Sequence, residues 1–136
     1  MILYRPVGLG ELEKIAASGY REFPPRFVWQ PIFYPVLSVE YARAIIRSWN
    51  SREEEAGFCG FVTEFDIDDE FVTRYPPQEA GGREFRELWV PAEDLPEFNR
   101  HILGEIRVIE RHYGDDFTGT LDPETGLPQS VIDADR

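Results

Sequence analysis

Three short stretches of the chain carry side chains that could hold a charged or aromatic ligand. Arg5 closes the apolar stretch ILYR, and a guanidinium group can fork onto a phosphate or a carboxylate. Phe33 and Tyr34 lie between two prolines, just before a helix pattern. Glu87 opens the stretch ELWVP beside Trp89, and an acid next to a large aromatic residue can mark the wall of a ligand pocket.

Each of these residues also has a purely structural interpretation. Arg5 would then pair with a surface glutamate, and Glu87 would be solvated. If Leu88 and Val90 face the core, alternation along a strand turns Glu87 toward the other side. Trp89 shares that side. A shared outer face fits both a cleft and an ordinary sheet surface, so the sequence leaves both interpretations open.

No general catalytic motif accompanies these candidates. The chain has no glycine-rich phosphate loop, no GxSxG and no HExxH. His101 and His112 do not neighbour an obvious nucleophile, and Cys59 falls in an apolar strand pattern that predicts a buried, inert thiol. A zinc site would need these three residues to converge with a carboxylate, and their spacing is not that of zinc ligands. We therefore predict no metal.

Length and composition indicate one globular domain. The 136 residues are 42% apolar, which is enough for a core, and no run of 18 apolar residues predicts a membrane span. The first residues, MILYRPVGLGEL, predict a strand rather than a targeting peptide. A single cysteine excludes an internal disulfide framework and is typical of a reducing compartment. We expect a cytoplasmic protein.

The net charge of −12 excludes some partners. Nucleic acids and anionic membranes are bound largely through neutralisation of phosphate groups, so we expect neither as a partner. All but one of the 14 basic residues are arginines, and a local anion site formed by Arg5, Arg83 and Arg86 stays open. The oligomeric state is not indicated.

Strand and helix patterns alternate along the chain and predict a mixed α/β domain over 1–113. Apolar periodicity predicts strands at 2–5, 32–36, 58–67, 85–90 and 105–110, and helices at 9–16, 38–50 and 94–102. The clearest helix has Ser38 as its N-cap, Trp49 on its apolar face and Asn50 at its end. The segment 114–136 contains six acidic residues and one basic residue, which predicts an acidic C-terminal tail or a hairpin around DPETG.

The chain resembles one bacterial family of small proteins, often labelled ADP-ribosylation/crystallin J1, over roughly 2–112. The similar stretches are LYRPVGLGELEKI at 3–15, QPIFYPVLSVEYA at 30–42, WN at 49–50 and ELWVPAEDLPEFNRHILGEIRVI at 87–109. The ADP-ribosyl hydrolase fold that the label suggests is larger, metal-dependent and all-helical, whereas this chain has many strand signals. Its element order is more similar to that of ADP-ribosyltransferases. The resemblance implies an α+β fold of that type, a split mixed sheet with short flanking helices.

The same resemblance implies a site for NAD as substrate. In one branch of ADP-ribosyltransferases, an Arg lies on the first strand, a Ser-Thr-Ser segment precedes a helix, and a Glu lies on a later strand. Arg5 matches the first position and Glu87 is the candidate for the third. The diphosphate would then lie near Arg5, Tyr34 would stack on nicotinamide, and Glu87 would act as the catalytic residue on the ribose. Phe33 and Trp89 would be further binding residues.

Two departures from that pattern limit what the resemblance implies. FYP at 33–35 stands in place of the Ser-Thr-Ser segment, and Tyr34 does not reproduce the serine. Phe85 stands where arginine-modifying members carry an acid, so transfer to arginine side chains is not implied.

Three functions remain open on this basis. The first is an NAD-binding ADP-ribosyltransferase-like protein that modifies an unidentified acceptor or hydrolyses NAD. The second is a non-enzymatic acidic interaction module, which fits the net charge and the missing serine segment. The third is a binder of another small ligand in the same pocket, with Trp29, Phe33, Tyr34 and Trp89 as its wall.

Overall fold

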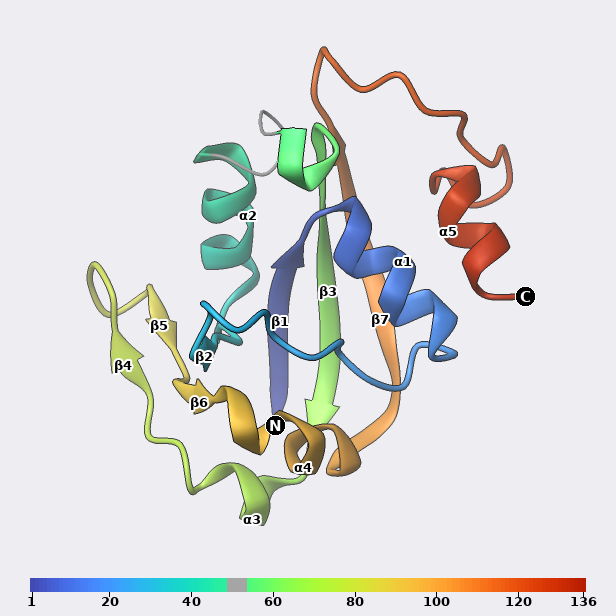
Figure 1. The fold of residues 1–136 in the computed structure, drawn as a ribbon. Coiled ribbons are helices and arrows are strands. Elements are labelled where there is room, and N and C mark those ends of the chain that lie inside the picture. The colour runs from blue at the N-terminus through green and yellow to red at the C-terminus, as the bar shows by residue number, and fades with distance from the viewer. Residues whose placement is uncertain (49–53) are drawn as a thin grey trace.

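The computed structural model describes residues 1–48 and 54–136 and belongs to the mixed α+β class, as predicted (Figure 1). The strands are β1 (Ile2–Val7), β2 (Ile32–Phe33), β3 (Cys59–Ile67), β4 (Gln78–Glu79), β5 (Arg86–Glu87), β6 (Val90–Pro91) and β7 (Ile102–Tyr113). The helices are α1 (Leu9–Ala17), α2 (Val39–Ser48), α3 (Asp69–Val72), α4 (Leu95–Arg100) and α5 (Gln129–Ala134), with 3-10 turns at Glu54–Ala56 and Ala92–Asp94. No helix within the described ranges is long and apolar enough to cross a membrane.

The centre of the fold is a three-stranded sheet in the order β1-β3-β7. Both pairings are antiparallel, with Leu3 opposite Phe65 and Ile67 opposite Ile102. Every strand pair in the described part of the chain is antiparallel, so the predicted mixed sheet is wrong. The reason lies in the connections: β7 starts at the end of the sheet where β3 finishes, and the chain therefore returns in the opposite direction.

A single residue joins this sheet to a smaller ribbon. Val36 forms antiparallel bridges with Tyr4 of β1 on one side and with Glu87 of β5 on the other. β5 then pairs with β4, while β2 and β6 form a separate two-stranded pair. The sheet is thus split beside β1, and the split places Glu87 across from the first strand.

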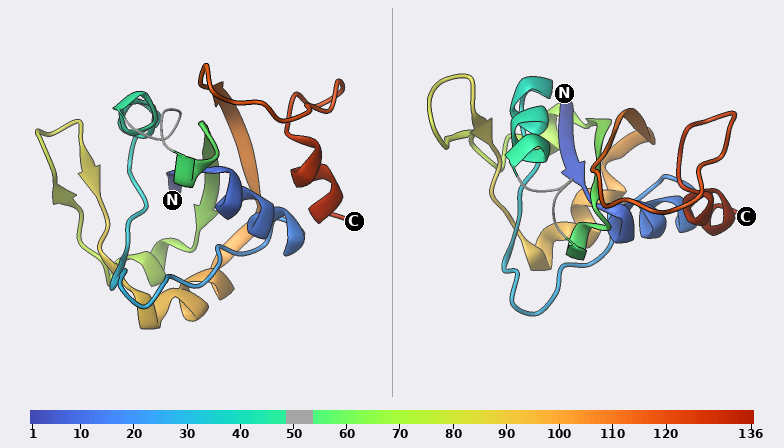
Figure 2. Two further views of the ribbon diagram at one scale, coloured as in Figure 1. Left: turned by 45° about the horizontal axis from the view of Figure 1, so that its top comes forward. Right: turned by 90° about the horizontal axis from the view of Figure 1, so that it is seen from above.

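The two faces of the central sheet pack against different helices, and the hydrophobic core is larger on one face than on the other. Phe61 and Phe65 belong to the main core, which includes the buried face of α1. Val62, which points the other way, packs with Ala42 and Ile46 of α2 in a smaller cluster. The further views in Figure 2 show α1 and α2 apart from each other, with the central strands between them.

Local signals positioned α2 and β3 correctly. The N–H of Tyr41 donates to Ser38 Oγ at 3.1 Å, which confirms the predicted N-cap. The predicted positions of Trp49 on the apolar face and Asn50 at the helix end lie outside the described residues. In β3, Cys59 is fully buried, and its thiol pKa is raised to about 12, mainly by burial and further by the charge of Glu13. The prediction of an inert cysteine agrees with this environment.

The predicted strand at 85–90 is broken in the structure. β5 pairs with β4, but Leu88 N–H donates to the carbonyl of Pro35 at 2.9 Å, and Val90 then pairs with Phe33 in β2. Across this break the segment 86–91 keeps one partner, 32–37, in a single antiparallel register, while β4 pairs with its first residues only. Leu88 and Val90 are buried, whereas Glu87 is half-buried and Trp89 exposed, which confirms the predicted alternation.

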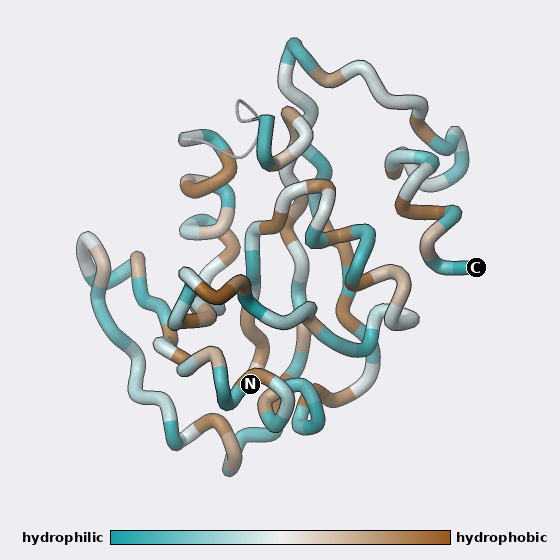
Figure 3. The backbone as a smooth tube through the Cα atoms, viewed as in Figure 1, coloured by the Kyte–Doolittle hydropathy of each residue, from teal (hydrophilic) through white to brown (hydrophobic). Residues whose placement is uncertain are grey.

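The acidic C-terminal segment is packed against the body of the domain. The predicted DPETG turn forms, and the only strand-like pairing described within 114–136 is the bridge between Leu121 and Pro128. A helix that the sequence did not predict, α5, then packs against α1 with Leu127 and Val131 buried. In Figure 3 the apolar residues of α5 are brown segments within an otherwise polar end of the chain.

A close approach between the start of α1 and the turn before β3 depends on Gly57. Its φ is +77°, and a Cβ there would lie 2.9 Å from Leu9 Cβ. We expect Gly57→Ala to lower the free energy of unfolding by about 2–4 kcal/mol, because left-handed strain and a steric clash add. Gly19→Ala is the matched control, since its φ is +75° with open space around the Cβ position. Equal losses in urea unfolding of the two variants would contradict the close approach.

Candidate functional site

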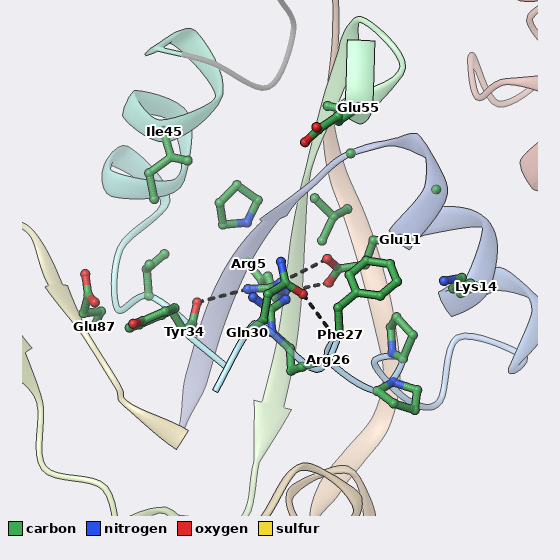
Figure 4. A pocket seen from close by; sticks show the side chains of 18 of the residues that line it. Arg5, Glu11, Lys14, Arg26, Phe27, Gln30, Tyr34, Ile45, Glu55 and Glu87 are labelled. Carbon is green, nitrogen blue, oxygen red and sulfur yellow. Dashed lines mark hydrogen bonds and ion pairs between the residues drawn. The ribbon is translucent and has the colours of Figure 1, made fainter. Parts of the chain in front are cut away.

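A cleft of about 630 Å³ opens where the sheet is split, between the end of β1, the start of α1, the loop 24–30, α2 and β5 (Figure 4). Cavities of 300–1,000 Å³ are typical of small-molecule and cofactor sites. The charged side chains that line it are Arg5, Glu11, Lys14, Arg26, Glu55 and Glu87. The cleft therefore carries three cationic and three anionic groups in a chain whose net charge is −12.

Four of the five predicted site residues line this cleft: Arg5, Tyr34, Glu87 and Trp89. They come from three distant parts of the chain, and in Figure 4 Tyr34 lies between Arg5 and Glu87. Tyr34 and Trp89 are 41% and 51% exposed, so both rings are accessible to a ligand.

Phe33 does not line the cleft. It is fully buried, with ring centroids 5.1 Å from Phe23 and 5.6 Å from Phe98. Phe33 and Tyr34 are consecutive residues of an extended segment and point to opposite sides, so they cannot both face the same ligand. The role of Phe33 is indirect, because the guanidinium carbon of Arg5 lies 4.6 Å from its ring centroid.

Arg5 is 8% exposed and makes three hydrogen bonds to two residues. Its Nε–H donates to Glu11 Oε2 at 2.6 Å, its Nη2–H donates to Glu11 Oε1 at 3.0 Å, and its Nη1–H makes a longer contact of 3.4 Å with the Tyr34 carbonyl. A guanidinium has five N–H donors, so two remain for a ligand. Glu11 already balances the charge of Arg5, which leaves Arg5 less free to bind a phosphate than the sequence suggested.

Glu87 is oriented by two donors, one on each carboxylate oxygen. Tyr41 O–H donates to Oε1 at 2.5 Å, and Trp89 Nε1–H donates to Oε2 at 2.9 Å. Burial, and next the hydrogen bond to Glu87, raise the pKa of Tyr41, so this phenol stays protonated and remains a donor. Tyr41 in turn stacks on Phe85, with ring centroids 5.0 Å apart. Each oxygen of Glu87 keeps a lone pair for a hydroxyl of a ligand.

Arg26 is the cationic residue of the cleft that sequence reasoning missed. It follows Pro24 and Pro25 in the loop, and Figure 4 shows its side chain beside Arg5 and Glu11. Its Nε is buried and has no hydrogen-bond partner among the described residues. Burial, and then the charge of Arg5, lower the pKa of Arg26 below its usual value. The only signal in the sequence was an arginine directly after two prolines.

Other residues considered from the sequence lie outside the cleft. Arg83 and Arg86 are exposed and do not contribute to it. Trp29 is 75% exposed and stacks on Phe27, a residue of the cleft, at a centroid distance of 4.9 Å, without lining the cleft itself. In the described ranges, no group of three or more His, Cys, Asp or Glu side chains could hold a metal ion.

The arrangement offers a ligand three kinds of contact: guanidinium groups for an anion, aromatic faces for a flat ring, and an oriented carboxylate for hydroxyl groups. Comparison with known proteins adds no relative to this description: no protein-family model matches the chain, and no curated protein and no solved structure matched it.

Proposed function

We propose that the chain binds NAD in this cleft and acts as an ADP-ribosyltransferase-like protein, transferring ADP-ribose to an acceptor or to water. The observation that carries the proposal is the meeting of Arg5, Tyr34 and Glu87 in one cleft of about 630 Å³. The split sheet, with an arginine on the first strand and a glutamate on β5, which the bridge residue Val36 separates from that strand, supports an ADP-ribosyltransferase-like architecture.

The contacts of Glu87 suit it to the reacting end of the ligand. Since Tyr41 and Trp89 each use one lone pair of its carboxylate, the oxygens are held in place and still accept hydrogen bonds from ribose hydroxyls. The negative charge also stabilises the positive charge that develops on the ribose when the glycosidic bond to nicotinamide breaks. Tyr34, at the accessible edge beside Glu87, offers a face for the nicotinamide ring.

A thermal-melt titration with NAD and with ADP-ribose tests the binding step. A ligand present at about 100 times its dissociation constant adds about 2.7 kcal/mol to stability, which raises the melting temperature by several degrees in a domain of this size. Absence of a shift with both ligands at millimolar concentration would contradict the proposal. The remaining candidates would then be the acidic interaction module, tested by salt-sensitive capture of a basic partner, and the binder of another small ligand in the same pocket.

Nicotinamide release tests the chemical step. Glu87→Gln is expected to reduce the rate by about 100- to 1,000-fold, the usual effect of removing one group that stabilises developing charge. Glu79→Gln is the matched control, because Glu79 is exposed on β4, next to β5, and does not line the cleft. Equal rates in wild type and Glu87→Gln would rule out this role for Glu87.

A further inference from the structure

Arg26 and Arg5 place two guanidinium groups beside one carboxylate. Glu11 directs both of its oxygens to Arg5, at 2.6 and 3.0 Å. Arg26 lies against this ion pair in Figure 4, yet its buried Nε makes no hydrogen bond within the described part of the chain. A buried polar atom without a partner costs free energy and needs an explanation, and the guanidinium that carries it lines the cleft.

The charges of the cluster point to an anion. Arg5, Arg26 and Glu11 together carry one excess positive charge, and Lys14 lines the same cleft with its Nζ 5.2 Å from the ring centroid of Phe27. Two like charges in a half-buried site repel each other, and a ligand that carries negative charge removes that cost. Because Glu11 already occupies the fork of Arg5, Arg26 is the cation with the larger share of free donors.

We propose that Arg26 is the residue that binds the diphosphate of the ligand. Arg5, whose donors are bound by Glu11, is a positioning residue that lies beneath this anion subsite. The identity of the ligand as a nucleotide rests on the proposed function, whereas the anion subsite rests on the cluster alone. Arg26 lines the cleft and offers a planar guanidinium that matches two phosphate oxygens. The assignment moves the phosphate contact from β1 to the loop 24–30.

The test compares Arg26→Gln with Arg21→Gln by calorimetric titration of ADP-ribose and of inorganic pyrophosphate. Arg21 is exposed, lies five residues earlier and does not line the cleft, so its variant makes the same charge change elsewhere. We expect Arg26→Gln to weaken binding of both compounds by about 10- to 100-fold and to reduce the salt dependence of binding, with Arg21→Gln close to wild type. Arg26→Lys keeps the charge without the fork and is expected to fall between them.

The outcomes separate this inference from the proposed function. Equal binding by wild type and Arg26→Gln overturns the role of Arg26 and leaves nucleotide binding intact. Binding of pyrophosphate that Arg26→Gln abolishes, without binding of NAD or ADP-ribose, supports the anion subsite and overturns the nucleotide proposal. Absence of binding of both phosphate compounds to the wild type overturns both. A thermal melt of each variant without ligand confirms that it is folded.

Discussion

Replacing Glu11 by glutamine is expected to lower the free energy of unfolding by about 2–4 kcal/mol, a large share of the stability of a typical domain. The substitution keeps the size of the side chain and removes the charge that holds Arg5. Arg5 is 8% exposed, and its two shortest contacts, at 2.6 and 3.0 Å, both go to this carboxylate. Urea unfolding at neutral pH measures the loss, provided that the slope with denaturant is unchanged.

Glu97→Gln is the control for this prediction. Arg74 and Glu97 form an ion pair of similar length, 2.8 Å, but their side chains are 56% and 40% exposed. Exposed pairs contribute less than about 1 kcal/mol, because solvent screens both charges. Similar losses in the two variants would show that burial does not make the pair of Arg5 and Glu11 special.

The same variant also tests what the cleft binds. With the amide in place of the carboxylate, one of the two Arg5 donors loses its acceptor, and the excess positive charge of the cluster with Arg26 doubles. Pyrophosphate is therefore expected to stabilise Glu11→Gln by a larger shift in melting temperature than it stabilises the wild type. A smaller shift in the variant would mean that Glu11 itself contacts the ligand, which is incompatible with an anion subsite at this position.

The elements that the sequence predicted well depend on local patterns. The alternation along β3 and the capping of α2 by Ser38 involve residues that lie close together in the chain. The pairing of 86–91 with 32–37 depends instead on contacts such as the bond from Leu88 N–H to the carbonyl of Pro35, a residue 53 positions away. No local pattern predicts which distant residues the segment pairs with, because the pattern predicts a strand whatever its partners are.

The site shows the same division between local and distant information. Alternation correctly turned Glu87 and Trp89 away from the core, but it also excludes Phe33 once Tyr34 faces the cleft. Arg26 could not be found in this way, since it lies in a loop and loops have no periodicity. Its position beside Arg5 follows only from the path of the chain between α1 and β2.

Val131→Asp is expected to release α5 from α1 and to lower the free energy of unfolding by about 2–4 kcal/mol. Val131 is fully buried and Leu127 nearly so, and burying such side chains contributes about 1.5–3 kcal/mol each. A charge cannot stay at that position without a partner, so the short terminal helix leaves rather than the whole domain unfolding. Thermal unfolding of the full chain gives the loss, and limited proteolysis within 114–128 reports the release.

Ser130→Asp places the same charge on the neighbouring, exposed residue of α5 and is expected to change stability by less than about 0.5 kcal/mol. Equal melting temperatures for the two variants would mean that 114–136 behaves as the independent acidic tail that its composition suggests.

The effect of Val131→Asp on binding is expected to differ from its effect on stability. α1 presents Glu11 to the cleft and other residues to α5, and its own buried residues Leu12 and Ile15 keep it on the sheet. Below its melting temperature, Val131→Asp should therefore bind ADP-ribose as the wild type does, whereas Arg26→Gln should lose binding and keep its stability.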